Sequence, residues 1–362
     1  MVTRKAQRLR SGFWRGKRVL LTGHTGFKGA WLALWLHRLG ARVTGVSLAP
    51  ATQPNLFTLA GVEQLLDHHV LDIRDGPALG VVVRRARPEV VLHLAAQALV
   101  RASYEDPALT FSTNVMGTVQ LLEALRQSSG ARVVLVATTD KVYRNREAGH
   151  AFVETDELGG HDPYSASKAA TEIVLASYRD AFLAHAGTAV ASVRAGNVIG
   201  GGDWAADRLL PDAMRAWGDG QTLAVRRPVA VRPWQHVLEP LQAYLGLAEC
   251  LWQQPELASA YNSGPDPEQC SSVREVLQLA RAAYGAGDIE IALGVEGVHE
   301  AGVLLLDSSR IRSVLGSRSG WSLAQTVSRS VAWYRAQRSG TPAQQLCDDD
   351  IAAFESMARR AA

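Results

Sequence analysis

The sequence predicts an α/β protein with a doubly wound parallel sheet and a smaller C-terminal lobe. Short apolar runs of strand length alternate with longer segments of helical periodicity through the first 200 residues. A glycine-rich turn joins the first of these strands to the first helix. Beyond residue 200 the alternation gives way to Gly-, Asp- and Pro-rich stretches and amphipathic helices. Together these observations indicate a Rossmann-type domain followed by a second lobe.

The first elements frame the glycine turn. Residues Arg18–Thr22 (RVLLT) are predicted as a buried strand, and GHTGFKG follows at once. The next segment, AWLALWLHRLG, has apolar residues at helical spacing and stops at Gly40, which is typical of a helix end. ARVTGVSL is predicted as the second strand, and Asp67–Leu71 as a weaker third.

The remaining elements of the first half continue the alternation. They are a fourth strand over Glu89–Gln97, a helix over Pro107–Gln127, a fifth strand over Ala131–Thr139, a helix that carries Tyr164 and Lys168 and runs to about Ala186, and a sixth strand that opens at Ala189. Right-handed crossovers in such a sheet place a ligand at the carboxyl ends of the strands.

Length, charge and cysteine content limit the class of protein. A chain of 362 residues exceeds the usual size of a single core. We therefore expect a basic N-terminal extension at 1–15, a nucleotide-binding domain at 16–200, and a mainly substrate-binding lobe with C-terminal helices at 201–362. The extension, rich in Lys and Arg, is predicted to be solvated, although a phosphate contact is an alternative.

Charge, hydropathy and cysteine content also indicate which partners and which cellular compartment to expect. A net charge of +3 is too small to indicate a nucleic-acid partner. No apolar run reaches the roughly 18 residues of a membrane span. The three cysteines are scattered without CxxC spacing, so we expect a reduced, cytoplasmic protein with no metal site.

The glycine turn predicts a dinucleotide site. Gly23, Gly26 and Gly29 follow the first strand and open the first helix, an arrangement that holds a pyrophosphate. The acid that usually binds the adenosine ribose after strand two is missing, and Ser47 lies there instead. Asp72, after strand three, could contact the adenine edge or cap a helix.

Tyr164 and Lys168 form a second chemical signal. Their spacing places both on one face of a helix. A phenol is a poor base at neutral pH, but a nearby ammonium and the positive nicotinamide favour its phenolate form. Such a tyrosine takes the proton of a secondary alcohol while the cofactor takes the hydride.

Five motifs together resemble the extended short-chain dehydrogenase/reductase superfamily, and within it the CDP-glucose 4,6-dehydratase family. The motifs are TGHTGFKG, HLAAQ, TTDK, YSASK and RAGNVIGGGDW. The resemblance implies a Rossmann domain with a small substrate domain, NAD as a tightly held cofactor, and a homodimer or homotetramer. The predicted cofactor-binding residues are Gly23, Thr25, Gly26, Phe27, Gly29, Asp72, Ile73, Ala95, Ala96, Tyr164 and Lys168.

The resemblance also gives a role to the TTDK loop. It implies that CDP-glucose is oxidised at C4, loses water across C5 and C6, and receives the hydride back at C6. Thr139 would hydrogen-bond the C4 oxygen, and Asp140 would protonate the departing hydroxyl. Lys141 would act as a neutral base, or would stabilise the enolate by its charge. A plain loop ion pair between Asp140 and Lys141 is the alternative.

Four further residues are predicted to bind the nucleotide-sugar. Asn197 and Arg208 would meet the pyrophosphate, and Arg232 and His236 the nucleotide end. Capping or salt bridges between lobes are the alternatives for these four. Two other functions fit the same fold: a nucleotide-sugar epimerase or reductase, and a non-catalytic NAD-sensing protein. The sensor would have no need of the Tyr164/Lys168 pair.

Overall fold

The computed structural model describes residues 9, 12–147, 149–291, 301–316 and 320–360. Much of the predicted basic extension, including Arg4, Lys5, Arg8 and Arg10, lies outside the described residues. The part nearest the first strand packs on the protein: Trp14 is buried, and its Nε1 donates to Glu249 Oε1 at 2.8 Å.

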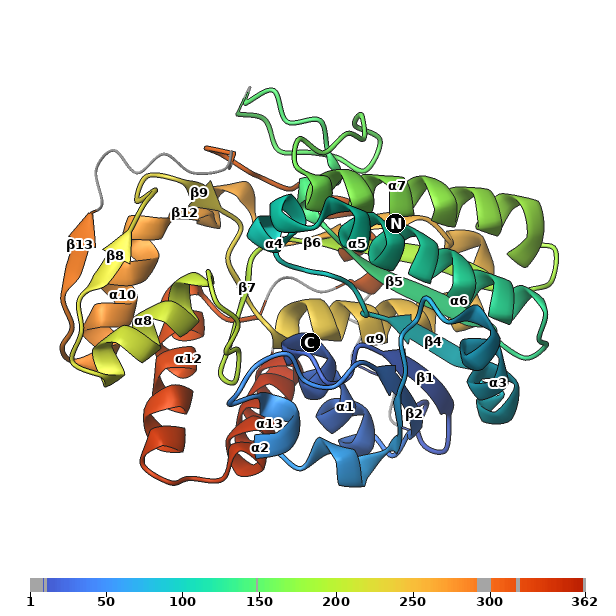
Figure 1. The fold of residues 1–362 in the computed structure, drawn as a ribbon, viewed down its shortest axis with the longest axis horizontal. Helices are drawn as coiled ribbons and strands as arrows, with labels where there is room; N and C mark the ends of the chain where they lie inside the picture. The colour runs from blue at the N-terminus through green and yellow to red at the C-terminus, as the bar shows by residue number, and fades with distance from the viewer. Residues whose placement is uncertain (1–8, 10–11, 148, 292–300, 317–319, 361–362) are drawn as a thin grey trace.

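A seven-stranded sheet forms the centre of the molecule (Figure 1). All its neighbouring strands are parallel. From one edge to the other the strands are β11 (Ala260–Ser263), β6 (Ala189–Ala195), β5 (Val133–Thr139), β4 (Val90–His93), β1 (Arg18–Thr22), β2 (Arg42–Ser47) and β3 (Asp67–Val70). The order reverses between β1 and β4, the type of position at which open α/β sheets bind ligands.

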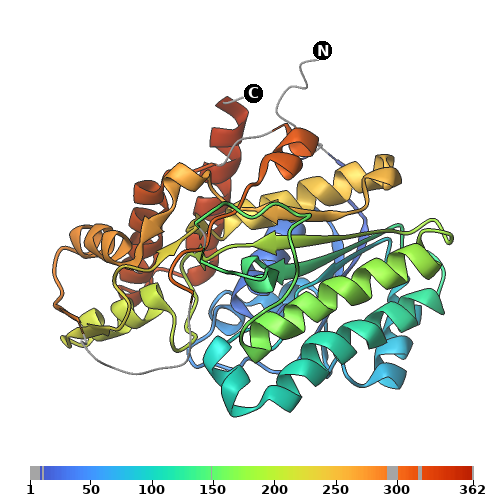
Figure 2. The same cartoon turned by 90° about the horizontal axis from the view of Figure 1, so that it is seen from above.

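Both faces of the sheet are covered by helices. Successive side chains along each strand point to opposite sides, so each strand contributes to two cores. Val19 and Leu21 join the core beneath α1 and α9, whereas Leu20 joins the core beneath α3 and α6. The apolar runs in the sequence therefore predict strands that lie between two helical layers. The confirmed fold class is a doubly wound α/β sheet, and Figure 2 shows the layers from above.

The helices of one layer are α3 (Gly76–Ala86), α4 (Val100–Glu105), α5 (Pro107–Phe111), the π-helical turn η2 (Ser112–Met116), α6 (Gly117–Arg126), α7 (Pro163–Tyr178) and the π-helical turn η4 (Arg179–Leu183). The opposite layer contains α1 (Phe27–Arg38), α9 (Leu238–Gln253) and α13 (Ala343–Arg360), with α2 (Leu56–Leu59), the 3₁₀ turn η1 (Val62–Leu65), α11 (Ser309–Leu315) and α12 (Leu323–Arg338) beside them. Helix α1 ends before Gly40, whose φ of 79° is the left-handed conformation expected there.

The smaller lobe is built from short paired strands and two helices, on the left of Figure 1. Its elements are α8 (Leu209–Gly218), β8 (Leu223–Val225) paired with β13 (Ile289–Ile291), β9 (Val231–Arg232) paired with β12 (Ser271–Ser272), and α10 (Val273–Tyr284). Strands β7 (Val198–Ile199) and β10 (Gln235–His236) pair where the chain leaves the sheet. The short 3₁₀ turns are η3 (Asp140–Val142), η5 (Pro255–Leu257) and η6 (Pro267–Gln269).

The chain returns to the sheet after the predicted boundary at residue 200. Strand β11 pairs with β6, and α9 packs on β5 and β6. The sequence analysis did not predict this seventh strand, because AYNS is short and has neither a long apolar run nor clear alternation. Residues 238–263 therefore belong spatially to the sheet, although they follow the first segment of the smaller lobe.

Candidate active site

A large cleft opens at the carboxyl ends of the strands, between the sheet and the smaller lobe. Its volume is about 1260 Å³. Pockets for one small ligand measure roughly 300–1,000 Å³, so this cleft has room for a dinucleotide and a second molecule. Its walls come from the glycine loop, the ends of β2 to β6, the start of α7, and residues 200–232 of the smaller lobe.

The glycine loop fits the backbone of a dinucleotide. Gly23 has a φ of 78°, and a Cβ built on it would lie 2.6 Å from the Ala95 nitrogen. A Cβ on Gly29 would lie 2.0 Å from the Gly23 oxygen. Only glycine is compatible with these two close approaches. Gly26 caps α1 without a side-chain hydrogen bond, which leaves the first amides of this 12-residue helix open to a phosphate.

Residues after β2 and β3 line the other end of the same wall. Thr25 Oγ1 lies 2.7 Å from Ser47 Oγ, at the end of β2. Asp72 pairs with Arg74 at 2.6 Å, and the hydrogen bond from Arg74 lowers the pKa of this carboxyl. The cap of α3 is Asp75, which accepts from the Ala78 amide, so the cap alternative for Asp72 does not hold.

The other predicted cofactor residues also reach the cleft. Phe27, Ile73, Ala95 and Ala96 line it together with the glycines of the loop. Ile73 is buried beneath the wall, and a Cβ on Gly117 of α6 would collide with it at 2.5 Å.

Helix α7 presents Tyr164 to the cleft, whereas Lys168 is buried one turn below. Asp162 caps this helix by accepting from the Ser165 amide at 2.9 Å. Burial raises the pKa of Tyr164 to about 12, against a hydrogen bond with Thr139 and the charge of Arg208, which lower it. Burial and the charge of Lys28 lower the pKa of Lys168 to about 8, while Glu172 acts in the opposite direction.

The charge that favours the phenolate in this structure is therefore Arg208, a residue of the smaller lobe. Lys168 Nζ donates to the Ala137 carbonyl at 3.2 Å, and the predicted action of this ammonium on the phenol stays a prediction. The phenol, whose pKa is raised, and the amine, whose pKa is lowered, lie one helical turn apart beside the cleft.

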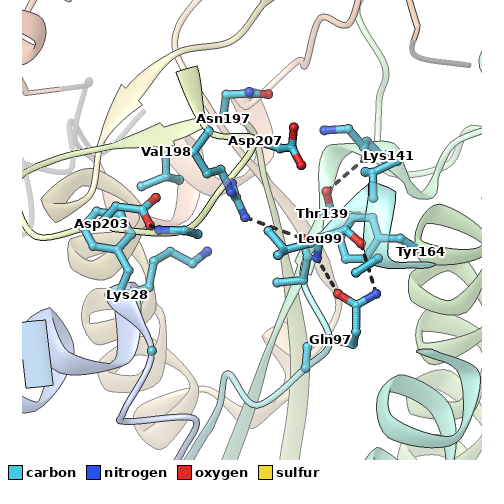
Figure 3. Close-up of a pocket in the computed structure, with 18 of the residues that line it drawn as sticks. Lys28, Gln97, Leu99, Thr139, Lys141, Tyr164, Asn197, Val198, Asp203 and Asp207 are labelled. Carbon is cyan, nitrogen blue, oxygen red and sulfur yellow. Dashed lines mark hydrogen bonds between the residues drawn. The ribbon is translucent and has the colours of Figure 1, made fainter. Parts of the chain in front are cut away.

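The 3₁₀ turn η3 begins where β5 ends and carries the second pair. Thr139 Oγ1 donates to Asp140 Oδ1 at 3.0 Å, and Lys141 Nζ lies 3.7 Å from the same oxygen. The other carboxylate oxygen, Oδ2, is buried and has no hydrogen-bond partner among the described residues. The Lys141 side chain is 27% exposed and lies close to Thr139 and Tyr164 (Figure 3). The ion pair that was the alternative to a catalytic role is present, but a buried carboxylate oxygen without a partner is typical of a reactive site.

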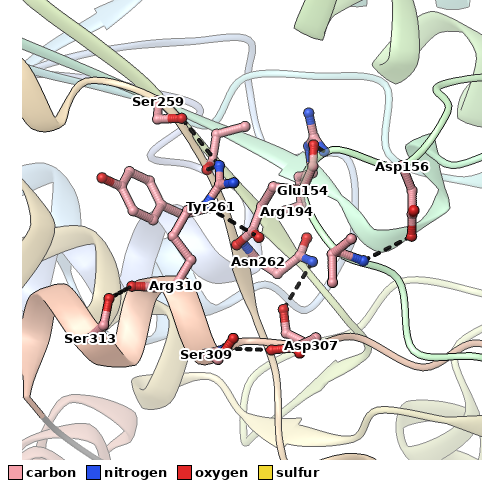
Figure 4. A network of polar contacts seen from close by, with 12 residues as sticks. Glu154, Asp156, Arg194, Ser259, Tyr261, Asn262, Asp307, Ser309, Arg310 and Ser313 are labelled. Atoms are coloured by element: carbon pink, nitrogen blue, oxygen red, sulfur yellow. Dashed lines mark hydrogen bonds and ion pairs between the residues drawn. The ribbon is translucent and has the colours of Figure 1, made fainter.

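A buried polar network holds this turn in place. Tyr143 Oη donates to Asn262 Oδ1 at 2.6 Å and accepts from Arg194 Nη1 at 2.9 Å. Arg194 pairs in turn with Glu172 of α7 at 2.9 Å, and Glu172 also accepts from Thr138 Oγ1. Figure 4 shows Arg194 and Asn262 beside Glu154 and Asp307, whose carbonyls accept from them. The turn with Asp140 and the helix with Tyr164 are thereby fixed to the same buried ion pair.

Three of the four predicted substrate residues line the cleft. Asn197 follows β6, and its Oδ1 is buried without a partner. Arg208 precedes α8 and reaches the Ala98 carbonyl at 3.5 Å. Arg232 is buried and donates to the carbonyl of Gly302 at 3.2 Å.

His236 does not reach the cleft and is a correction to the predicted site. It is fully buried between Trp31 and Trp321, with ring centroids 6.0 and 4.7 Å away. Burial lowers its pKa to about 3, so it is a neutral core side chain. The VRPWQH stretch places it there because β10 pairs with β7 and turns the ring inward. Trp234 of the same stretch is buried, and its Nε1 donates to the Ser271 carbonyl.

The structure adds cleft residues that the sequence analysis did not single out. Lys28 lies within the quoted GHTGFKG motif, and its side chain lines the cleft. Arg101 and Arg226 both pair with Asp207, at 3.3 and 3.1 Å, across the cleft mouth. A lysine among the loop glycines was a visible signal, whereas the arginine pair depends on long-range folding.

Two negative findings apply to the described part of the chain. No group of three His, Cys, Asp or Glu side chains there could hold a metal ion. No helix there combines the length and the apolar character that crossing a membrane requires.

Comparisons with known proteins agree with this geometry. The model of the GDP-mannose 4,6 dehydratase family matches residues 20–328. The CDP-glucose 4,6-dehydratase of Salmonella typhimurium is 44% identical over 330 residues, which cover 90% of this chain and 92% of the relative. Two solved structures each have a TM-score of 0.76. The Thermus thermophilus UDP-glucose 4-epimerase in complex with NAD is 26% identical, over 88% of this chain and 98% of its own. The Streptomyces venezuelae dTDP-glucose 4,6-dehydratase with NAD bound is 25% identical, over 89% and 98%.

The family match spans most of the chain, and the relative from Salmonella matches over nearly its whole length. The chain belongs to the GDP-mannose 4,6-dehydratase family, within the extended short-chain dehydrogenases/reductases, and its similarity to a CDP-glucose 4,6-dehydratase confirms the resemblance that its motifs predicted.

Proposed function

We propose that this protein is an NAD-dependent nucleotide-sugar dehydratase, a hydro-lyase that converts CDP-D-glucose to CDP-4-dehydro-6-deoxy-D-glucose and water. The observation that carries the proposal is the presence of two proton-transfer pairs at one cleft, Tyr164 with Lys168 and Asp140 with Lys141. An oxidation alone needs one such pair. The 44% identical relative named for this activity supports CDP-glucose as the substrate.

The glycine loop, Thr25, Asp72 and the segment with Ala95 and Ala96 would hold NAD along one wall of the cleft. The close approaches at Gly23 and Gly29 and the open start of α1 support this assignment. When bound, NAD accepts the hydride from C4 of the sugar and returns it at C6.

In the first step, the oxidation at C4, Tyr164 takes the proton of the C4 hydroxyl, with Thr139 as its hydrogen-bond partner. The charge of Arg208 favours the phenolate that this step requires. The resulting 4-keto group makes the C5 proton acidic, because the carbanion at C5 is stabilised as an enolate.

The ion pair between Asp140 and Lys141 can supply both groups that the elimination needs. Transfer of one proton from Lys141 Nζ to Asp140 gives a neutral amine and a carboxylic acid, and exclusion of water by the substrate favours this neutral pair. The amine takes the C5 proton, and the acid protonates the departing C6 hydroxyl as water. Both groups return to the charged pair seen at 3.7 Å, so the protons of the elimination balance. The proton that Tyr164 takes from the C4 hydroxyl offsets the one that C5 takes up when the hydride returns.

Isotope transfer tests the reaction directly. CDP-glucose with deuterium at C4 is expected to give a product that carries the label at C6, read by NMR and mass spectrometry. In heavy water, one solvent deuteron is expected at C5. A label that washes out, a product that has lost no water, or stoichiometric consumption of NADPH would favour an epimerase or reductase instead.

We propose that the chain forms a homodimer through the outer layer of α5, η2 and α7. Helix α7 packs against both α5 and η2, and Phe111, Met116 and Ile173 leave large apolar side chains exposed there. Exposed apolar surface on neighbouring elements is typical of a contact between protein copies.

Substitution at this surface is expected to produce a monomer. Ile173 is 62% exposed, so Ile173→Glu with Met116→Glu should leave the fold intact but prevent association. Light scattering after size-exclusion chromatography measures the mass of wild type and variant. Glutamates at the exposed Val81 and Leu48 provide the control, which should keep the wild-type mass. A dimer that survives the first pair of substitutions would place the interface elsewhere.

The predicted division at residue 200 and the predicted cytoplasmic setting stay proposals. The cleft between residues of both segments supports a nucleotide-binding part and a substrate-binding part. All three cysteines lie in the described part of the chain, and none forms a disulfide, in keeping with a reducing compartment.

A further inference from the structure

Lys28 places a partly buried ammonium group in the wall of the cleft. It is the second residue of α1, and its Nζ donates to Tyr244 Oη of α9 at 3.1 Å. Figure 3 shows its amine directed toward the centre of the cleft. Tyr244 is fully buried, and burial raises the pKa of its phenol above the ordinary range, so it offers a neutral oxygen and not a counter-charge.

No carboxylate of the described residues forms an ion pair with this amine. Lys141 has Asp140 within 4 Å, whereas no carboxylate in the described part of the chain lies that close to Lys28. Asp203, drawn near Lys28 in Figure 3, accepts from the Ala205 amide, and its charge is opposed by Arg208 and Arg215.

The surrounding charges are mostly positive. Burial and Arg208 lower the pKa of Lys28 to about 8, and only Asp140 acts in the opposite direction. Lys28 in turn lowers the pKa of Lys168. A partly desolvated charge without a counter-ion destabilises a protein, and a cleft that retains one is suited to a ligand of opposite charge.

The position in the chain identifies the chemistry of that ligand. Lys28 follows Gly26, whose loop leaves the first amides of α1 uncapped on the same wall. Amides of a helix start and a lysine ammonium together are suited to phosphate oxygens.

We propose that Lys28 is a phosphate-binding residue, whose ammonium neutralises the pyrophosphate of the dinucleotide. The inference rests on the proposed use of NAD, and it adds a side-chain ligand to a site otherwise made of backbone amides. The pyrophosphate of the nucleotide-sugar has the same chemistry, so the test includes both sources.

Binding of ADP-ribose, NAD, NADH and CDP is measured by calorimetry for wild type and Lys28→Met, after removal of copurified dinucleotide. The variant is expected to bind ADP-ribose, NAD and NADH about 10- to 100-fold more weakly, the usual effect of a charged hydrogen bond, with CDP unchanged. Arg85→Met, which removes a cation from the exposed side of α3, should bind all four like wild type.

Each other result overturns the inference in a recognisable way. Weaker CDP binding alone would assign the lysine to the nucleotide-sugar. Tighter NAD with weaker NADH would mean that it acts on the charge of the nicotinamide ring. Equal affinities for wild type and Lys28→Met would mean that it binds no phosphate. Wild-type protein that binds no dinucleotide at all would defeat the proposed function itself.

Two further measurements separate ligand binding from a structural role. The ligand-free Lys28→Met protein should unfold at the same or a higher temperature than wild type, because an uncompensated charge is replaced by an apolar side chain. A lower melting temperature would indicate that the bond to Tyr244 is structural. Lys28→Arg should restore most of the affinity.

Proton uptake gives the last test. At pH 9 the free amine of Lys28 is mostly neutral, and a bound phosphate should recharge it, so wild type takes up protons on binding ADP-ribose. Lys28→Arg stays charged both with and without the ligand, so it should take up fewer protons. Equal uptake by both proteins, from calorimetry in two buffers, would contradict the inference.

Discussion

Tyr164→Phe is expected to lower turnover by about 10²–10⁴-fold, the usual contribution of a positioned acid–base group, while the fold is retained. Only a hydroxyl is lost, and no described element depends on it for packing. The phenylalanine has no oxygen that could take the C4 proton, and the hydrogen bond to Thr139 is lost as well. The loss should fall on the first oxidation, before any water is released.

Stopped-flow absorbance of the nicotinamide with CDP-glucose measures this step. In wild type the phenolate fraction grows tenfold per pH unit below the pKa of about 12, so the oxidation should accelerate as pH rises until another step becomes limiting. The phenylalanine variant should lose this dependence. Tyr178→Phe on the same helix removes a hydroxyl that bonds Glu123, outside the cleft, and should turn over like wild type. Unchanged activity of Tyr164→Phe would exclude the phenol as the base.

Asp140→Asn is expected to block water loss by about 10²–10⁴-fold while the oxidation at C4 continues. The amide cannot receive a proton from Lys141, so neither the neutral amine nor the carboxylic acid forms. Lys141→Met should fail at the same step, since it removes the other half of the pair. Reduced nicotinamide absorbance should therefore persist in both variants.

Water loss is followed by the mass of the sugar product after rapid quenching. Asp180→Asn removes a carboxylate of an exposed ion pair outside the cleft and should leave product formation unchanged. If Asp140→Asn slows the oxidation as strongly as the elimination, the two pairs do not act separately, and the division of labour proposed above is wrong.

Local sequence patterns predicted the nucleotide-binding wall well. Gly23 and Gly29 are required by close approaches within a few residues of the first strand, and such short-range constraints are visible in the sequence. Strands β1, β4, β5 and β6 were predicted because each is a largely apolar run that is buried on both faces. Their ends differ from the prediction by a few residues, as when β4 stops at His93 and leaves Leu94 to Gln97 to line the cleft.

Features set by distant contacts could not be predicted in this way. The place of His236 depends on Trp31 and Trp321, which lie some 205 residues before and 85 residues after it in the chain. The direction of Lys168 toward the Ala137 carbonyl, and the role of Arg208 at the phenol, likewise depend on where separate segments meet. A spacing such as YxxxK gives the face of a helix but not the electrostatic field around it.

The return of the chain to the sheet at β11 affects how the protein must be made. A ribosome-bound chain that ends near residue 200 has an open edge along β6, and the face that α9 will cover is still bare. The bond from Trp14 to Glu249 cannot form until 235 more residues have emerged. Exposed strand edges and apolar surface invite aggregation, and contacts so distant in sequence slow folding. The edge along β6 is therefore paired only after β11 has been synthesised. The first 200 residues alone are not expected to fold as an independent unit.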